Sequence, residues 1–271
     1  MNYIKDVLNY YLKNFIYILV ITIIPAVILG LIANPFALAE FLANYPSYKI
    51  TTFGDLFFAV YNLGWIDVLW IVLSLIILVV YLSIMLGFIE SHFRTGNPSL
   101  VNSLKINLNA LSVIKTAIVL AIYTFVVNFV LLLLIYLLHI LTAVDGYGAS
   151  FVMFFNYVIA IFGLYPIARG FSLVSFANIE MLINGSPFRV AMSNAFLAVG
   201  QNVMSVFVVE VIIFLTTFMI ATICSLIGVA WLGSILGLLI ILPLMCVSAM
   251  NMFFKYYGLK RYDNRKYYNL R

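Results

Sequence analysis

The chain has 271 residues and a formal net charge of +5, and 66% of its residues are hydrophobic while only 8% are charged. Soluble domains carry about 25% charged residues, so this composition excludes a water-soluble globular protein and indicates that lipid is the main solvent. The length suffices for six membrane helices of about 20 residues with their connections, so we expect a single integral membrane domain over residues 1–271.

The first apolar stretch, residues 15–33, predicts a membrane helix in which Pro25 introduces a kink. Two lysines precede the stretch and an Ala-Leu-Ala sequence follows it at residues 37–39, a combination that also occurs in secretory signal peptides. The apolar stretch is longer than the ~7–15 residues of a signal peptide's apolar region. We therefore expect it to be retained as the first membrane helix.

Five further apolar stretches predict five more membrane helices. The segment between the first two spans, residues 34–64, is too polar to cross a bilayer, and its phenylalanine-rich part at residues 53–58 predicts a location partly in the membrane interface. The fourth stretch stays apolar as far as Ile183, so it either tilts or breaks near Pro166 and Gly170. The predicted spans after the first are residues 65–89, 116–141, 151–177, 203–227 and 231–254.

Two features of the last spans concern packing. Gly233 and Gly237 form a small-xxx-small motif, which we expect to allow close approach of another helix of the same chain. Cys224 and Cys246 both lie in apolar stretches, so we expect two core side chains and no disulfide framework.

The distribution of lysine and arginine predicts the orientation of the chain. Across the predicted connections, twelve basic residues lie on one side and only Lys49 on the other, while Arg169 lies inside a span. This asymmetry predicts a multi-pass protein of the cell (plasma) membrane with its N- and C-termini in the cytoplasm. The tail from Lys255 to Arg271 carries six of the basic residues and five tyrosines. We interpret it as an orientation signal and a contact for anionic lipids, and not as a nucleic-acid-binding segment.

Two connections on the predicted cytoplasmic side share a turn made of glycine, a polar residue and proline. The two turns are Gly96-Asn97-Pro98 and Gly185-Ser186-Pro187. Glycine permits a sharp turn, Asn97 or Ser186 can cap a new helix, and proline suits its first position. An amphipathic stretch follows each turn, over residues 101–110 and 190–199, and residues 6–13 look like the same element without its turn. We therefore predict three repeated helical hairpins, each entered through an interfacial elbow.

The two turns and their amphipathic elbows resemble those of a poorly characterised group of bacterial six-span membrane proteins. That group includes the membrane domain fused to some glycerophosphodiester phosphodiesterases. The resemblance covers most of the chain and implies an all-α, six-span fold, but it implies no established substrate. The sequence contains no phosphodiesterase catalytic domain, so the resemblance does not extend to that activity.

Arg169 and Glu210 are the charged residues predicted to lie deepest in the membrane, both roughly 10–12 Å inside the cytoplasmic boundary at about 1.5 Å per residue. A charge at the centre of a membrane helix costs at least ~2.5–3.5 kcal/mol, so we expect the two side chains to pair across spans four and five. The pair either fixes helix register or couples to an ion or an anionic substrate. A third interpretation is that Arg169 snorkels to the interface. Pro166 and Gly170 are candidates for a helix break of the kind that forms transporter sites, and the alternative that we favour is a simple proline kink.

The sequence contains no motif of a metal- or nucleotide-dependent enzyme, and His92 and His139 are expected on opposite sides of the membrane. We therefore expect a non-enzymatic integral membrane protein, without cofactors, in a membrane-organising or accessory role. Its expected partners are membrane lipids, with a membrane protein or a second copy as further candidates, and no nucleic acid.

The alternative function is a secondary transporter or an ABC-type permease subunit that uses the intramembrane Arg169 and Glu210. The permease alternative rests on the spacing of Glu90 and Gly96, which loosely resembles the coupling loop of importer-type permeases. A continuous polar cavity that reaches Arg169 would favour transport.

Overall fold

The computed structural model describes residues 2–45, 50–61, 65–98, 100, 110–145 and 148–263. In these ranges the chain forms ten α-helices and no strand, which confirms the predicted all-α fold class. Six of the helices are long and apolar enough to cross a membrane, so the chain is a multi-pass membrane protein. They are α2 (Phe15–Ile32), α5 (Trp65–Thr95), α7 (Ala110–Asp145), α8 (Ala149–Asn184), α10 (Val203–Leu226) and α11 (Ala230–Tyr256).

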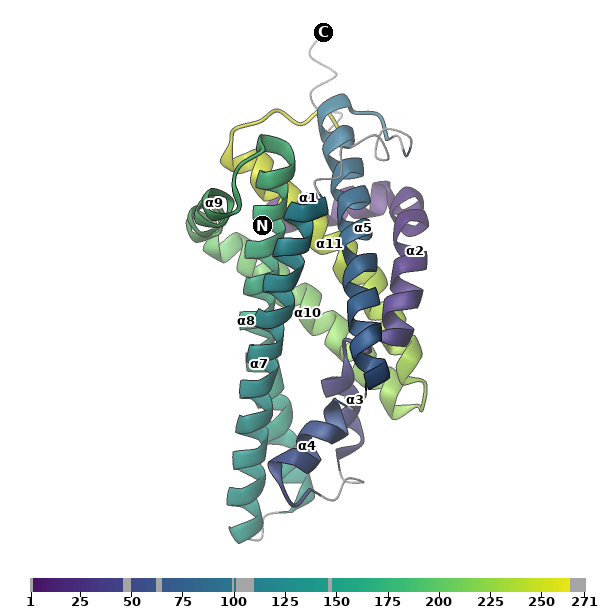
Figure 1. The fold of residues 1–271 in the computed structure, drawn as a ribbon, viewed down its shortest axis with the longest axis vertical. Helices are drawn as coiled ribbons and strands as arrows, with labels where there is room; N and C mark the ends of the chain where they lie inside the picture. The colour runs from purple at the N-terminus through teal and green to yellow at the C-terminus, as the bar shows by residue number, and fades with distance from the viewer. Residues whose placement is uncertain are drawn as a thin grey trace.

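The six long helices form a bundle along the long dimension of the molecule (Figure 1). Consecutive spans pack as hairpins, because α2 contacts α5, α7 contacts α8 and α10 contacts α11. The predicted hairpin pairing is therefore observed in the described structure. Helix α11 also contacts α2, α5 and α8, and it is the most buried of the six spans.

Helix α11 lies in the centre of the bundle, and glycines allow its neighbours to approach it closely. A Cβ atom on Gly233 would lie 2.8 Å from the Cβ of Cys224 on α10, closer than side chains tolerate. A Cβ atom on Gly30 of α2 would lie 2.7 Å from the Ile235 side chain. A Cβ atom on Gly237 would also lie too close to a neighbouring side chain. The small-xxx-small motif thus packs against helices of the same chain, as the sequence predicts.

Two short helices, α3 (Ala37–Ala43) and α4 (Phe53–Val60), follow α2 and fill the end of the bundle opposite to the chain termini (Figure 1). Helix α3 contacts α8 and α10, and α4 contacts α7. Phe41, Leu42 and Leu56 are fully buried there in a second hydrophobic core. The sequence predicts an interfacial location for this segment, but much of its apolar surface is covered by the spans, because α7, α8 and α10 offer it apolar partners.

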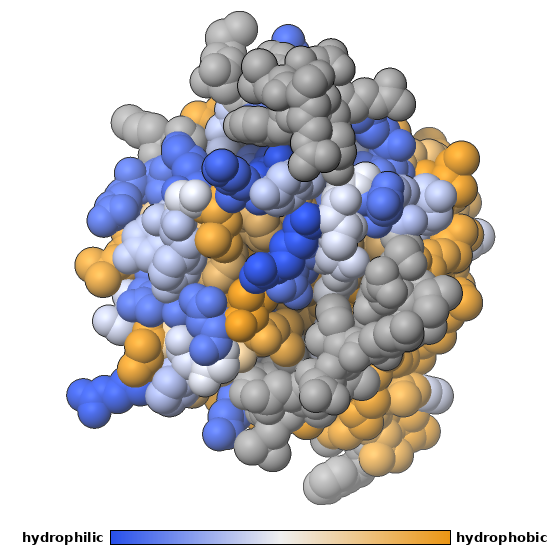
Figure 2. Space-filling view, turned by 90° about the horizontal axis from the view of Figure 1, so that it is seen from above, coloured by the Kyte–Doolittle hydropathy of each residue, from blue (hydrophilic) through white to orange (hydrophobic). Residues whose placement is uncertain are grey.

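Helices α1 (Asn2–Lys13) and α9 (Phe188–Gln201) lie at the other end, which also holds residues 257–263; we call this the terminal end. In Figure 1, α9 is seen nearly end-on beside α8 and therefore lies crosswise to it. Figure 2 shows hydrophilic residues gathered on the terminal end and hydrophobic residues around its rim. This polarity fits a bundle whose sides face lipid and whose terminal end faces water.

The two predicted elbow turns are formed by their glycines. Gly96 has φ 75° and Gly185 has φ 65°, in the left-handed region that glycine adopts without strain. After the second turn, the predicted helix is present as α9, but its N-cap is Pro187 and not Ser186. The Ser186 hydroxyl instead donates to Glu180. Asn97 and Pro98 are described, whereas the elbow predicted for residues 101–110 lies almost entirely outside the described residues.

Candidate functional site

Glu210 on α10 is completely buried in the bundle. Its Oε1 accepts a hydrogen bond from the hydroxyl of Ser172 on α8. Its second carboxylate oxygen, Oε2, is buried and has no hydrogen-bond partner among the described residues. Because an unpaired polar atom in a bundle core costs free energy, Glu210 marks the candidate site in the spans.

Arg169 lies one turn before Ser172 on α8, and its charge acts on Glu210 electrostatically. The two side chains form no ion pair: among the described residues, the ion pairs are Glu90 with Arg94 and Arg261 with Asp263. The Nη1 atom of Arg169 is buried and also lacks a hydrogen-bond partner. The two residues lie on contacting helices, α8 and α10, but the predicted direct pairing is not seen, and the Glu210 carboxylate accepts a hydrogen bond from Ser172 instead.

Two further polar contacts join helices of the bundle. The hydroxyl of Tyr3 on α1 donates to the backbone oxygen of Ser248 on α11 over 2.6 Å, and Tyr3 is close enough to Glu210 for an electrostatic interaction. Thr116 on α7 donates to the side-chain oxygen of Asn178 on α8. Sequence reasoning missed these residues, since single serine, threonine or asparagine residues in apolar stretches show no partner until the helices are placed.

Pro166 and Gly170 do not break α8, which is continuous from Ala149 to Asn184, so the predicted candidate helix break is wrong. Both residues instead contact Tyr123 of α7. The Tyr123 hydroxyl donates to the backbone oxygen of Pro166 over 2.8 Å. A Cβ atom on Gly170 would overlap the Tyr123 ring. Pro166 and Gly170 therefore lie at a close contact between α7 and α8. Helix α8 is continuous and does not form the discontinuous helix of a transport site.

A second buried carboxylate, Glu180, joins several elements at the terminal end of α8. Four side-chain donors surround it, within 2.8–3.1 Å. They are Asn184 Nδ2, Ser186 Oγ, Asn194 Nδ2 and the hydroxyl of Tyr257. Burial, and then the hydrogen bond to the Glu180 carboxylate, raise the pKa of Tyr257 to about 12. Glu180 therefore ties α8 to the elbow turn, to α9 and to the end of α11.

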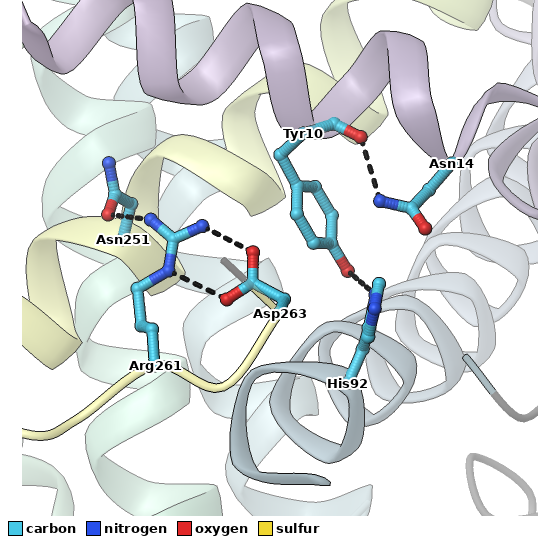
Figure 3. Close-up of polar contacts among 6 residues, drawn as sticks. All are labelled: Tyr10, Asn14, His92, Asn251, Arg261 and Asp263. Atoms are coloured by element: carbon cyan, nitrogen blue, oxygen red, sulfur yellow. Dashed lines mark hydrogen bonds and ion pairs between the residues drawn. The ribbon is translucent and has the colours of Figure 1, made fainter. Parts of the chain in front are cut away.

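The described part of the C-terminal tail folds back onto α5 through Arg261 (Figure 3). Its guanidinium donates to Asn251 on α11 over 2.5 Å and to both oxygens of Asp263, over 3.1 Å and 2.7 Å. It also lies 3.9 Å from the centre of the Phe93 ring, a cation–π contact. The sequence assigns this arginine to the lipid surface, but it is an internal anchor, and its partners lie too far apart in the chain to be recognised from spacing.

The two histidines lie at opposite ends of the bundle, as the sequence predicts. Nδ1 of His92 is 3.0 Å from the Tyr10 hydroxyl, as Figure 3 shows, and Nδ1 of His139 is 2.7 Å from the Tyr45 hydroxyl. Within the described ranges, no three His, Cys, Asp or Glu residues are grouped so that they could hold a metal ion.

Comparison of the chain with protein families, with curated proteins and with solved structures finds no match.

Proposed function

We propose that the chain is a non-enzymatic protein of the bacterial cell membrane that organises the lipid leaflet at its terminal end, alone or as the accessory of a larger membrane system. The observation that carries this proposal is the surface of α9. The helix buries Ala191, Ala195 and Ala198 against the bundle. On its exposed side it carries large apolar residues beside polar ones.

The apolar residues exposed by α9 are Val190, Phe196 and Leu197, which are 46%, 60% and 54% exposed. Arg189 and Ser193 are exposed between them. A crosswise helix with both kinds of side chain suits the boundary between headgroups and acyl chains, where such helices insert ~5–10 Å deep. Helix α1 repeats the pattern, with Leu8 and Leu12 exposed near lysines.

The anchoring of α9 supports the same role. Asn194 of α9 donates to Glu180 of α8 over 3.0 Å, and Ser186 in the preceding turn donates to the same carboxylate. Small alanine side chains allow α9 to pack closely on the bundle. A helix held in this way cannot retreat from the interface when lipids move, so it spreads the headgroups of one leaflet persistently. The basic residues of this end favour the cytoplasmic leaflet.

The proposal is tested by reconstituting the protein into phospholipid vesicles containing a dye whose emission reports lipid packing. The wild type should shift the emission toward looser packing in proportion to the protein-to-lipid ratio. The triple variant Val190→Ser, Phe196→Ser, Leu197→Ser should lose most of this shift. The matched control Leu141→Ser, Leu226→Ser, Ile227→Ser removes three exposed apolar side chains at the opposite end and should retain it. Equal shifts for all three proteins would refute the role of α9.

A secondary transporter is the second candidate, favoured by the buried and unpartnered atoms of Glu210 and Arg169. Ionisable groups inside membrane bundles commonly mark ion or substrate pathways. Proteoliposomes with an internal pH dye test this candidate. An imposed membrane potential should then drive proton uptake that Glu210→Gln abolishes, and identical traces from both proteins and from empty vesicles would exclude proton coupling.

A further inference from the structure

His139, near the end of α7, is hydrogen-bonded through both nitrogens of its ring. Nδ1 lies 2.7 Å from the Tyr45 hydroxyl, just after α3, and Nε2 lies 3.1 Å from the backbone oxygen of Ile50, before α4. Because a backbone oxygen only accepts hydrogen bonds, Nε2 carries the hydrogen atom of the neutral ring. Nδ1 is then an acceptor, and the Tyr45 hydroxyl donates to it.

Asn156 of α8 continues this line of polar groups into the bundle. It is completely buried, and neither its Oδ1 nor its Nδ2 atom has a hydrogen-bond partner among the described residues. Burial raises the pKa of the Tyr45 hydroxyl, whereas the Asn156 amide acts in the opposite direction, so the amide lies close to that hydroxyl. Since buried amides are nearly always hydrogen-bonded, an unused amide beside a hydroxyl indicates a second arrangement in which the two are joined.

Exposure decreases along the three side chains. His139 is partly exposed, Tyr45 is 7% exposed and Asn156 is fully buried. Tyr45 belongs to the hydrophobic core at the end of the bundle opposite to the terminal end. A proton therefore enters this line of groups at His139, and its charge stays there, because a charge deeper in the core costs more free energy.

A proton on His139 reverses the hydrogen bond between its ring and Tyr45. Nε2 keeps its hydrogen atom and its bond to Ile50, while Nδ1 gains a hydrogen atom and becomes a donor to the Tyr45 oxygen. The hydroxyl hydrogen of Tyr45 must then turn to another acceptor, and Oδ1 of Asn156 is buried and unpartnered. The only covalent bond formed is the new N–H bond of the imidazolium, and no group other than a proton from water is needed.

We infer that His139, Tyr45 and Asn156 form a proton-binding relay, in which a proton on His139 turns the Tyr45 hydroxyl from α7 toward α8. Without the proton, Tyr45 donates to His139 and the Asn156 amide stays unused. With the proton, Tyr45 accepts from His139 and donates to Asn156, so that it joins α7 to α8 at the end of α3. The relay responds to the pH at the end opposite to the terminal end, and it does not depend on the role proposed for α9.

The titratable groups of the neighbouring elements supply no counter-charge to His139. The described ones at this end of α3, α4, α5, α7 and α8 are Glu40, Asp55, Tyr61, Asp67, Tyr136 and Tyr157. Asp55 accepts hydrogen bonds within its own capping box, and Glu40 accepts one from Asn34. No carboxylate in the described ranges forms an ion pair with His139. A protonated His139 therefore relies on its two hydrogen-bond partners, Tyr45 and Ile50.

The test is nitrogen-15 magnetic resonance of the detergent-solubilised protein labelled at its histidines, between pH 5 and 8. The chain has only two histidines, so the ring signals of His92 and His139 are followed separately. Asn156→Leu should lower the affinity of His139 for a proton by about ten-fold, because the Tyr45 hydroxyl then has an acceptor only while Nδ1 is unprotonated. Tyr45→Phe removes the connection, so adding Asn156→Leu to it should change nothing further.

Two controls and the wild type make the result specific. Asn128→Leu removes an amide from α7 about three turns before His139 and should leave its titration unchanged, and His92 is the internal reference. In the wild type at pH 8, the ring hydrogen of His139 should lie on Nε2, and a hydrogen on Nδ1 would overturn the relay without any variant. An unchanged His139 in Asn156→Leu, an effect of Asn156→Leu that persists in Tyr45→Phe, or an equal change at His92 would overturn it as well.

Discussion

The two buried glutamates differ in how many donors surround them. Glu180 accepts hydrogen bonds from four side chains, whereas Glu210 accepts one from Ser172 and keeps an unpartnered oxygen. Burying a carboxylate is tolerated when donors satisfy it and is costly when they do not. We therefore assign Glu180 to the assembly of the terminal end and Glu210 to a site that is open to a further ligand or proton.

Glu180→Gln should lower the thermal stability of the detergent-solubilised protein. The substituted amide turns an NH₂ group toward donors that need an acceptor, at a cost of about 1–3 kcal/mol. Glu90→Gln is the matched control, because Glu90 only pairs with Arg94 one turn away on the helix surface, where such pairs contribute ~0.3–0.5 kcal/mol. Thermal unfolding that falls equally in both variants would contradict the role of Glu180.

Arg169 and Glu210 should show energetic coupling without the full strength of a buried ion pair. In a double-mutant cycle of Arg169→Gln and Glu210→Gln, the double variant should lose less stability than the sum of the single variants, by about 0.5–3 kcal/mol. The expected coupling is modest because the groups act on each other electrostatically but are not hydrogen-bonded. Strictly additive losses would show that the two charges are independent.

Among the structural elements, the features that depend on the length of apolar stretches and on the positions of glycines can be predicted from the sequence. All six spans, the left-handed Gly96 and Gly185 and the close packing of α11 follow from these signals. The ends of the spans are less predictable: α8 continues past the expected residue 177 to Asn184, and Glu180 in this last part accepts hydrogen bonds from within the protein.

The residues of the candidate site are likewise only partly predictable from the sequence. Arg169 and Glu210 are recognisable because charges are rare in spans, but Ser172 is not, since its partner lies 38 residues away. The anchoring of Arg261 likewise needs α5 and α11 to be placed before Asn251 and Phe93 surround it.

The contact between α7 and α8 gives a test at this scale. Gly170→Ala should destabilise the protein by about 1–3 kcal/mol, because the added methyl group overlaps the Tyr123 ring. Gly200→Ala in α9 is the matched control, since a Cβ atom there meets nothing within 4 Å and alanine favours the helix. Thermal unfolding should separate the two variants, and equal stability would show that α7 and α8 do not approach as closely as described.

Helix α4 should be sensitive to acid through its capping box. Hydrogen bonds from Thr51 and Thr52 lower the pKa of Asp55 from 3.8 to about 2. Because the folded pKa is the lower one, the contribution of Asp55 to stability is present above about 3.8 and is lost as the pH falls toward 2. The protection of the α4 amides against hydrogen exchange, relative to the intrinsic exchange rate at each pH, should therefore fall over this range. Asp55→Asn should abolish this pH dependence, and a dependence that persists in the variant would point to another group.

At the scale of the whole molecule, the described structure is polarised from end to end. Helices α1 and α9, the Glu180 cluster and the Arg261 anchor gather at the terminal end, while α3 and α4 close the opposite end with an aromatic core (Figure 1). The role proposed for α9 depends on this polarity. It requires the terminal end to lie at one membrane surface, and the basic residues favour the cytoplasmic surface.

The topology of the chain tests this central requirement most directly. A reporter active only outside the cytoplasm and one active only inside it are each inserted after Asp145, between α7 and α8, and fused after Arg271 at the C-terminus. We predict an external signal at Asp145 and a cytoplasmic signal at Arg271, since α8, α10 and α11 make three crossings between these points. Signals from the same side at both positions would contradict the six-span account, and an inverted pair would assign α9 to the opposite leaflet.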